Sequence, residues 1–310
     1  MGRYRNALPQ LGDEVYLADS GLETDLIFNA GFELPEFAAF VLLDSPDGVK
    51  ALRDYYDRHV AVAREAGRGI VLEAPTWRAS EDWGARVGAD TAALAAANRD
   101  AVGLLTAVRD SAGPTTVVIS GSIGPRHDAY RPDRLMAVDE AERYHSAQVD
   151  TFAGTDADLV TAMTLTYVDE AVGIARAARA AGVPAVLSFT VETDGALPDG
   201  TRLGDAITRV DAATDGYVSY FMVNCAHPSH FEDELDAEAS WAPRVRGLRA
   251  NASRMSHEEL DAAPELDAGD PVELAADYAA LVARMPSLRV VGGCCGTDAR
   301  HIEQIAAALG

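Results

Sequence analysis

The residues best suited to chemistry in this chain are its only three cysteines, Cys225, Cys294 and Cys295. Three thiolates around one Zn²⁺ leave the fourth tetrahedral position open, which is the catalytic rather than the structural arrangement. Thiolates also favour a borderline metal over Mg²⁺ or Ca²⁺. A thiol that takes the open position loses its proton, because the cation stabilises the anion. The pattern therefore predicts a zinc site that activates a thiol for alkyl transfer.

The same residues allow other interpretations. Because Cys294 and Cys295 are adjacent, they could form a vicinal disulfide or lie as small side chains in the core. A different metal site could combine Cys225 with His227 and His230, but it would leave the adjacent pair unexplained. The glycines on both sides of the pair let the backbone approach a ligand closely, which favours a functional role. In the three-cysteine arrangement, His227 is expected to line the pocket.

The sequence alternates short β-branched runs with longer segments of helical periodicity, and this alternation predicts the strands and helices that would position the cysteines. The runs predicted as strands are Val15–Ala18, Ile70–Ala74, Thr116–Ser120, Leu159–Ala162, Ala185–Thr190, Val218–Asn224, Val245–Ala250 and Leu288–Gly292. Eight strand–helix repeats are typical of a (β/α)8 barrel, and 310 residues is slightly above its usual size of about 250. An open, doubly wound sheet is the alternative. We predict a single barrel domain over residues 1–310.

Two helices carry clear end signals. Ser45 is a predicted N-cap before Pro46 and opens a helix with apolar residues from Val49 to Ala63. A second helix, from Val168 to Ala181, is expected to end at Gly182.

Barrel enzymes carry their chemistry at the carboxyl ends of the strands. Cys225 follows the sixth predicted strand, and Cys294 and Cys295 follow the eighth. Only one strand lies between these two, so the side chains can converge although 69 residues separate Cys225 from Cys294.

Other strand ends carry weaker candidates. Asp19 could bind an ammonium group or orient a donor, although an Asp after a strand is as often a turn residue. Arg78 and Arg126 could pair with a substrate carboxylate, and Trp77 could face a sulfonium through a cation–π contact. Asn224 could hydrogen-bond substrate or orient a metal ligand.

Several of these segments together resemble the homocysteine S-methyltransferase family over about residues 15 to 305. The paired-cysteine motif with its upstream Asn-Cys is the specific part of the resemblance. The matching segments are Asp19–Thr24, Thr76–Ser80, Gly121–Pro125, Ala185–Thr190, Val223–Cys225 and Gly292–Thr297.

The resemblance implies a (β/α)8 barrel with Zn²⁺ on the three cysteines. It implies methyl transfer to homocysteine, giving methionine, from S-methylmethionine or S-adenosylmethionine. Its small-molecule partners are thus a thiol and a methyl donor. With the residue-level candidates above, it gives a substrate-binding set of Asp19, Ser20, Gly21, Glu23, Thr24, Met163 and Asn224.

Two residues depart from the family pattern. Met163 stands where the family carries a glutamate that holds the amino group of homocysteine. A thioether cannot neutralise an ammonium, so a charge-assisted hydrogen bond worth about 1.5–3 kcal/mol would be missing. Either Glu73, Glu23 or Glu192 supplies the charge, or the acceptor is a different thiol. Ser20 replaces a glycine, which is a milder change.

Composition narrows the partners and the setting. With 49 acidic against 26 basic residues and a net charge of -23, the chain is poorly suited to nucleic acid phosphates or anionic membranes. No run reaches the roughly 18 apolar residues of a membrane span, and the amino terminus lacks a signal-peptide core. We therefore expect a cytoplasmic protein. The sequence leaves the oligomeric state open, a homo-oligomer included.

Two functions besides methyl transfer fit the cysteines. A zinc-binding or thiol-sensing barrel would methylate nothing, and the loss of the glutamate at Met163 is the reason to consider it. A metallohydrolase would require a histidine or carboxylate among the zinc ligands.

Overall fold

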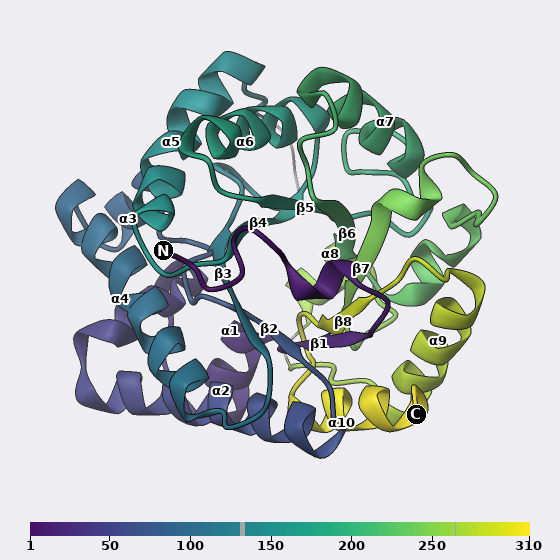
Figure 1. Ribbon diagram of the computed structural model, residues 1–310, viewed down its shortest axis with the longest axis horizontal. Helices are drawn as coiled ribbons and strands as arrows, with labels where there is room; N and C mark the ends of the chain where they lie inside the picture. The colour runs from purple at the N-terminus through teal and green to yellow at the C-terminus, as the bar shows by residue number, and fades with distance from the viewer. Residues whose placement is uncertain (131–133, 264) are drawn as a thin grey trace.

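Eight parallel strands form a closed barrel in chain order, with β1 hydrogen-bonded to both β2 and β8 (Figure 1). The computed structural model describes residues 1–130, 134–263 and 265–310. The strands are β1 (Tyr16–Ala18), β2 (Ile70–Glu73), β3 (Val117–Ile123), β4 (Leu159–Leu165), β5 (Ala185–Phe189), β6 (Tyr220–Asn224), β7 (Val245–Ala250) and β8 (Val290–Gly293). The predicted (β/α)8 barrel is confirmed, and the open-sheet alternative is wrong.

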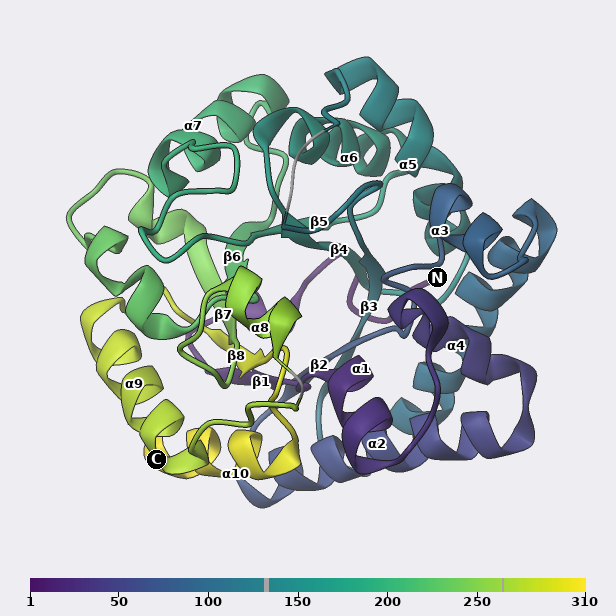
Figure 2. The same ribbon diagram turned by 180° about the vertical axis from the view of Figure 1, so that it is seen from behind.

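The α-helices surround the barrel or lie at one of its ends (Figures 1 and 2). They are α1 (Leu22–Thr24), α2 (Pro46–Glu65), α3 (Glu81–Arg86), α4 (Thr91–Ser111), α5 (Val138–Ala153), α6 (Val168–Ala181), α7 (Leu203–Thr214), α8 (His257–Ala262), α9 (Pro271–Arg284) and α10 (Ala299–Ala308). Both predicted end signals are confirmed: the Ser45 side chain accepts a hydrogen bond from the Gly48 N–H, and Gly182 ends α6 in the left-handed conformation. Within the described residues, no helix is both long and apolar enough to cross a membrane.

Strands β3 and β4 extend three residues beyond their predicted ends, to Ile123 and Leu165. The reason is pairing with neighbouring strands: Ile123 lies opposite Ala162 of β4, and Leu165 lies opposite Phe189 of β5. Short polar and glycine-containing stretches hide this extension in the sequence. As a result, Met163 lies within β4 rather than beyond its end.

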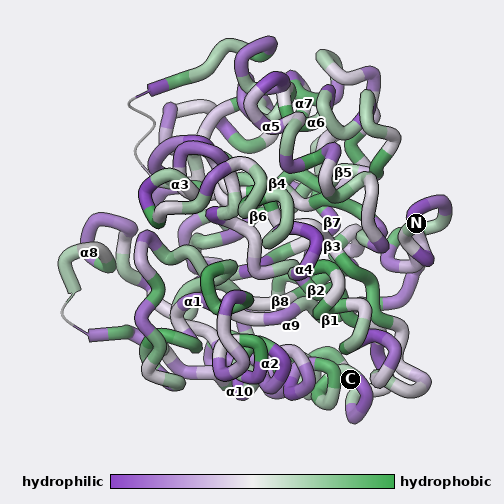
Figure 3. The backbone as a smooth tube through the Cα atoms, turned by 90° about the vertical axis from the view of Figure 1, so that its left-hand side faces the viewer, coloured by the Kyte–Doolittle hydropathy of each residue, from purple (hydrophilic) through white to green (hydrophobic). Residues whose placement is uncertain are grey.

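The amino-terminal segment closes one end of the barrel. Leu8 packs with the inward-facing strand residues, and Gln10 is fully buried. The Arg5 guanidinium donates hydrogen bonds to backbone carbonyls in segment 152–157. Figure 3 places this segment and α8 at opposite ends of the molecule. The α8 end is therefore the one at which residues that follow the strands can form a site.

Candidate active site

The three cysteines converge because both of their segments hydrogen-bond to the same strand. The N–H of Cys225 donates to the carbonyl of Arg249 at 3.1 Å, and the N–H of Cys294 donates to the carbonyl of Ala250 at 2.8 Å. Strand β7 thus aligns the ends of β6 and β8 on its two sides. The Cα atoms of Cys225 and Cys294 lie 5.4 Å apart.

The sulfur atoms of Cys225, Cys294 and Cys295 all lie within 4.8 Å of one another, close enough to hold one metal ion. Cys225 and Cys294 form a disulfide in this structure, whereas Cys295 is a free thiol with its sulfur 3.9 Å from that of Cys225. The cysteine pair that could bridge is therefore not the vicinal one. Burial and the nearby charge of Glu23 raise the pKa of Cys295 to about 11, so its thiolate needs a cation.

The alternative ligands His227 and His230 point elsewhere. His227 Nδ1 bonds to the Ser229 hydroxyl at 2.9 Å, and His230 Nε2 bonds to the carbonyl of Arg254 at 2.9 Å. Among the described residues, the metal-binding cluster contains neither histidine. The expectation that His227 lines the pocket is wrong for both cavities described below, because its ring turns toward Ser229.

The backbone of Cys225 is held in an unusual conformation. Its φ of 54° is left-handed, which is uncommon for a residue with a side chain. Its carbonyl accepts hydrogen bonds from His257 Nε2 at 2.6 Å, Asn251 Nδ2 at 3.1 Å and Thr190 Oγ1 at 3.4 Å. These donors offset the strain and fix the direction of the thiol. His257 lies on α8, and nothing in the sequence indicates that it reaches Cys225.

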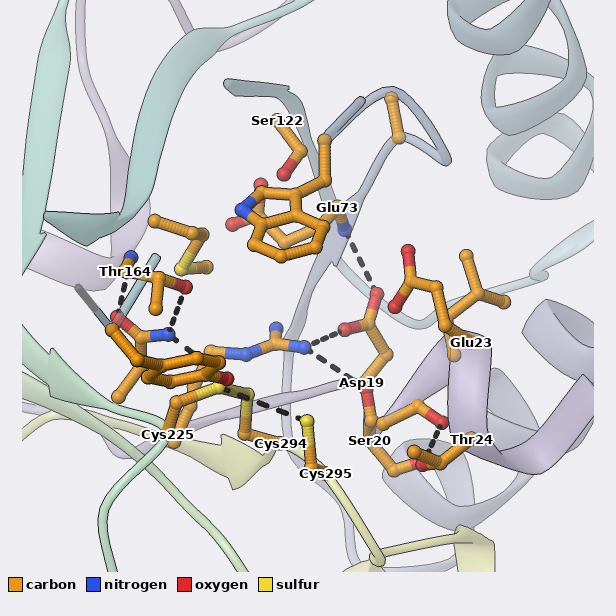
Figure 4. A pocket seen from close by; sticks show the side chains of 18 residues that line it. Asp19, Ser20, Glu23, Thr24, Glu73, Ser122, Thr164, Cys225, Cys294 and Cys295 are labelled. Carbon is orange, nitrogen blue, oxygen red and sulfur yellow. Dashed lines mark hydrogen bonds and ion pairs between the residues drawn. A yellow bond between two sulfur atoms is a disulfide. The ribbon is translucent and has the colours of Figure 1, made fainter. Parts of the chain in front are cut away.

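A cavity of about 80 Å³, here called the inner cavity, lies beside the cysteines (Figure 4). It is lined by every residue of the sequence-derived site: Asp19, Ser20, Gly21, Glu23, Thr24, Met163, Asn224, Cys225, Cys294 and Cys295. In Figure 4 the cysteines lie on one side, and Asp19 and Glu23 lie on the other. Glu73, Trp77, Tyr130 and Arg249 also contribute to the lining.

Asp19 is already paired with a cation. One carboxylate oxygen forms an ion pair with the buried guanidinium of Arg249, and the other accepts a hydrogen bond from the Glu73 N–H at 2.8 Å. Asp19 therefore positions β2 and β7 rather than offering a free charge to a ligand. Sequence reasoning missed Arg249, although a charged residue inside an otherwise buried strand signals a functional or paired position.

Two other acidic residues, Glu73 and Glu23, line the inner cavity, and neither forms an ion pair with a residue that the structure describes. Burial raises the pKa of Glu73 to about 7, and burial also raises the pKa of Glu23 to about 7. The Oε2 atom of Glu73 is buried and makes no hydrogen bond to any described residue. Met163 contributes an apolar thioether to the same cavity and is 7% exposed. Glu192 does not line it.

The segment after β1 supports the cysteine loop. Gly21 lies against the backbone of Cys294, and its N–H donates to Thr297 Oγ1 at 3.1 Å. Thr24 Oγ1 accepts a hydrogen bond from the Gly296 N–H at 3.1 Å. The Ser20 hydroxyl bonds to His59 Nε2 of α2 at 2.8 Å.

A larger space of about 600 Å³, here called the outer cavity, adjoins the inner one. Trp77, Glu23 and Cys295 line both cavities. Arg78 lines the outer cavity, whereas Arg126 lines neither and pairs with Asp82 and Glu140.

Comparison with known proteins relates this chain to methyltransferases that act on homocysteine and to methionine synthases. The sequence model of the family described as Homocysteine S-methyltransferase matches residues 16–309. The methionine synthase of Mycobacterium tuberculosis is 34% identical over 164 residues, and that of Mycobacterium leprae is 34% identical over 168 residues. Each match covers 50% of this chain but only 13% of the relative, so the chain spans a small part of those proteins.

Among solved structures, the homocysteine methyltransferase MmuM of Escherichia coli has the same fold. Its oxidized form is 24% identical with a TM-score of 0.76, and its metallated form is 23% identical with a TM-score of 0.74. Both alignments cover 97% of this chain and 98% of the other. Because the family model spans nearly the whole barrel and includes all three cysteines, this chain belongs to the homocysteine S-methyltransferase family.

Proposed function

We propose that this chain is a zinc-dependent methyltransferase that moves a methyl group from a sulfonium donor to homocysteine, giving methionine. The observation that carries the proposal is the convergence of Cys225, Cys294 and Cys295 beside the inner cavity. Family membership and the similarity to the E. coli homocysteine methyltransferase MmuM support homocysteine as the acceptor. The donor is S-methylmethionine or S-adenosylmethionine.

The donor set suits zinc, because thiolates favour a borderline metal and the three sulfurs lie within 4.8 Å of one another. The sulfurs of Cys225 and Cys295 lie 3.9 Å apart, which leaves room for both to bind one ion. Binding requires that the disulfide between Cys225 and Cys294 be reduced, because a metal ligand must be a thiolate. We infer a reducing compartment, such as the cytoplasm, for the active protein.

Cys225, Cys294 and Cys295 would hold the zinc, and its positive charge would stabilise the acceptor as a thiolate at neutral pH. The thiol proton leaves to solvent, and an electron pair of the acceptor sulfur forms the new S–CH3 bond. The C–S bond of the donor breaks, and its electron pair stays on the donor sulfur, which becomes a neutral thioether. The chain's own residues orient this exchange: Asn224 Nδ2 lies 3.9 Å from Cys294 Sγ and steadies that ligand.

Glu73 is the proposed partner of the acceptor's ammonium group. It lines the inner cavity together with Met163 and has a buried oxygen without a hydrogen-bond partner. Asp19 is occupied by Arg249, and Glu192 lies outside the cavity. In this proposal Glu73, at the end of β2, supplies the negative charge that a glutamate at position 163 on β4 would otherwise supply.

The test is zinc analysis and methyl transfer on protein purified under a reductant. We expect about one zinc per chain and turnover of homocysteine with S-methylmethionine or S-adenosylmethionine. Cys225→Ala, Cys294→Ala and Cys295→Ala should each lose zinc and activity. His227→Ala and His230→Ala serve as matched controls that keep zinc. Zinc binding without turnover of any thiol would instead favour a sensor, and full activity without metal would contradict the proposal.

A further inference from the structure

Arg78 is a buried cation that forms no ion pair with any of the residues that the structure describes. Only 7% of its surface is exposed, and its guanidinium lies 3.8 Å from the ring centroid of Trp77 and 3.5 Å from that of Trp83. Its Nε and Nη1 atoms are buried and make no hydrogen bond to the described residues. Burial lowers the pKa of Arg78 to about 10, so it keeps its charge at neutral pH. Two indole faces and the charges of Asp128 and Glu23 stabilise the guanidinium, but its Nε and Nη1 groups still have no acceptor among the described residues.

Hydrogen bonds from neighbouring elements hold the loop that carries Arg78. Thr76 Oγ1 donates to the carbonyl of Ser122 at 2.8 Å, and the carbonyl of Ala79 accepts a hydrogen bond from Asn98 at 3.0 Å. The indole N–H of Trp83 donates to the carbonyl of Pro125 at 3.0 Å. The guanidinium is thus held in place before any ligand arrives, which reduces the entropy lost on binding.

Charged residues around the outer cavity could bind a sulfonium that also carries a carboxylate. Glu23 brings a carboxyl group to the boundary between the two cavities, where a cationic sulfonium must meet the thiolate. Arg86 also lines the outer cavity, but it is exposed and pairs with Glu36 at 3.1 Å. Of the two arginines that line this cavity among the described residues, Arg78 is therefore the one available to bind an anionic group.

We propose that Arg78 binds the carboxylate of the methyl donor, an amino-acid sulfonium, in the outer cavity. The inference rests on the proposed function, in which the acceptor thiol occupies the inner cavity beside the cysteines. The methyl group of the donor must point toward that thiol for transfer to occur. The rest of the donor then extends into the outer cavity. A guanidinium binds a carboxylate through two parallel hydrogen bonds, for which its planar fork is suited.

The test compares two donors on the zinc-loaded protein. S-methylmethionine carries a carboxylate, whereas the trimethylsulfonium ion does not. In Arg78→Gln we expect the KM for S-methylmethionine to rise at least tenfold, with the KM for homocysteine unchanged. The kcat/KM for trimethylsulfonium should stay within twofold of wild type, which also shows that the variant is folded. Arg78→Lys should recover part of the loss. Arg126→Gln is the matched control and should change neither donor's KM, because Arg126 lies over the Tyr144 ring but lines neither cavity.

Other outcomes would overturn the inference. A rise in the KM for homocysteine would place the acceptor's carboxylate on Arg78, and an equal loss with both donors would make its role structural. If the wild type turns over no thiol, the proposed function fails, and fluorescence of Trp77 and Trp83 then reports donor binding directly. S-methylmethionine should change that fluorescence in wild type and not in Arg78→Gln. Equal binding by both proteins would contradict the inference.

Discussion

Both polar atoms of the Asn224 side-chain amide form hydrogen bonds to Thr164. Asn224 Oδ1 accepts the Thr164 N–H at 2.9 Å, and Asn224 Nδ2 donates to Thr164 Oγ1 at 3.0 Å. Thr164 has a φ of 61°, at the irregularity where β4 shifts its register against β5. One residue at the end of β6 thus holds β4 in the conformation that presents Met163 to the inner cavity.

Replacing Asn224 with alanine should therefore lower the free energy of unfolding. The change removes both bonds to Thr164 and the 2.6 Å bond from Ser188, all of them buried, so we expect a loss of about 2–4 kcal/mol. Urea denaturation measures it. Asn29→Ala is the control, because Asn29 is exposed and makes one side-chain bond, to Asp25. Equal stability of wild type and Asn224→Ala would contradict this account of Thr164.

The sequence could predict the barrel and the cysteine cluster, because strand periodicity and residue type carry that information locally. It could not predict which carboxylates are free. Asp19 looks like a ligand-binding acid at a strand end, yet Arg249 from β7 neutralises it, and only the closed barrel brings the two together. The hydrogen bond from His257 to the Cys225 carbonyl likewise depends on where α8 lies over the barrel.

Oxidation should abolish zinc binding by joining Cys225 to Cys294. The disulfide removes two of the three thiolates and leaves Cys295 free. After treatment with diamide we expect zinc content to fall at least tenfold, and one titratable thiol per unfolded chain in place of three. Dithiothreitol with added Zn²⁺ should restore the zinc content and the three titratable thiols. Mass mapping that finds Cys294 joined to Cys295 would contradict the assignment.

Glu73→Gln should weaken binding of homocysteine specifically. Loss of a charge-assisted hydrogen bond worth about 1.5–3 kcal/mol corresponds to a roughly 10- to 100-fold rise in the KM for homocysteine. A thiol without the amino group, 4-mercaptobutyrate, should show no such rise. Adding Met163→Glu to Glu73→Gln returns a carboxylate to the same cavity from β4, and we expect partial recovery. Equal losses with both thiols would show that Glu73 acts on the fold instead.

The buried carboxyl group of Glu73 should also make stability depend on pH. Its pKa is about 7 in the folded protein against an ordinary value of 4.5, so between these values the folded state binds the proton that the unfolded state has lost. Stability from this group is therefore complete below pH 4.5 and falls as pH rises to 7, by about 3 kcal/mol in all. The stability of Glu73→Gln relative to wild type should increase over that window in denaturation curves. A constant difference from pH 5 to pH 8 would refute the prediction.

The close approach of Gly21 to the cysteine loop gives the last prediction. A Cβ at Gly21 would overlap the carbonyl oxygen of Cys294 and lie 2.7 Å from Thr24 Oγ1. Because the Cys294 carbonyl belongs to the backbone, the loop must shift to accept the methyl group. Gly21→Ala should therefore move Cys294 relative to Cys225 and weaken zinc binding at least tenfold in competition with a chelator.

Gly103, in the middle of α4, provides the control for the added methyl group itself. It is exposed, and a Cβ there would meet no atom within 4 Å. Since alanine is favoured over glycine inside a helix, Gly103→Ala should raise the free energy of unfolding by about 0.5–1 kcal/mol and leave zinc affinity unchanged. If Gly21→Ala bound zinc as tightly as Gly103→Ala, the segment after β1 would not position the cysteine loop. Weaker zinc binding by Gly21→Ala alone would mean that contact between Gly21 and the cysteine loop after β8 sets the metal geometry.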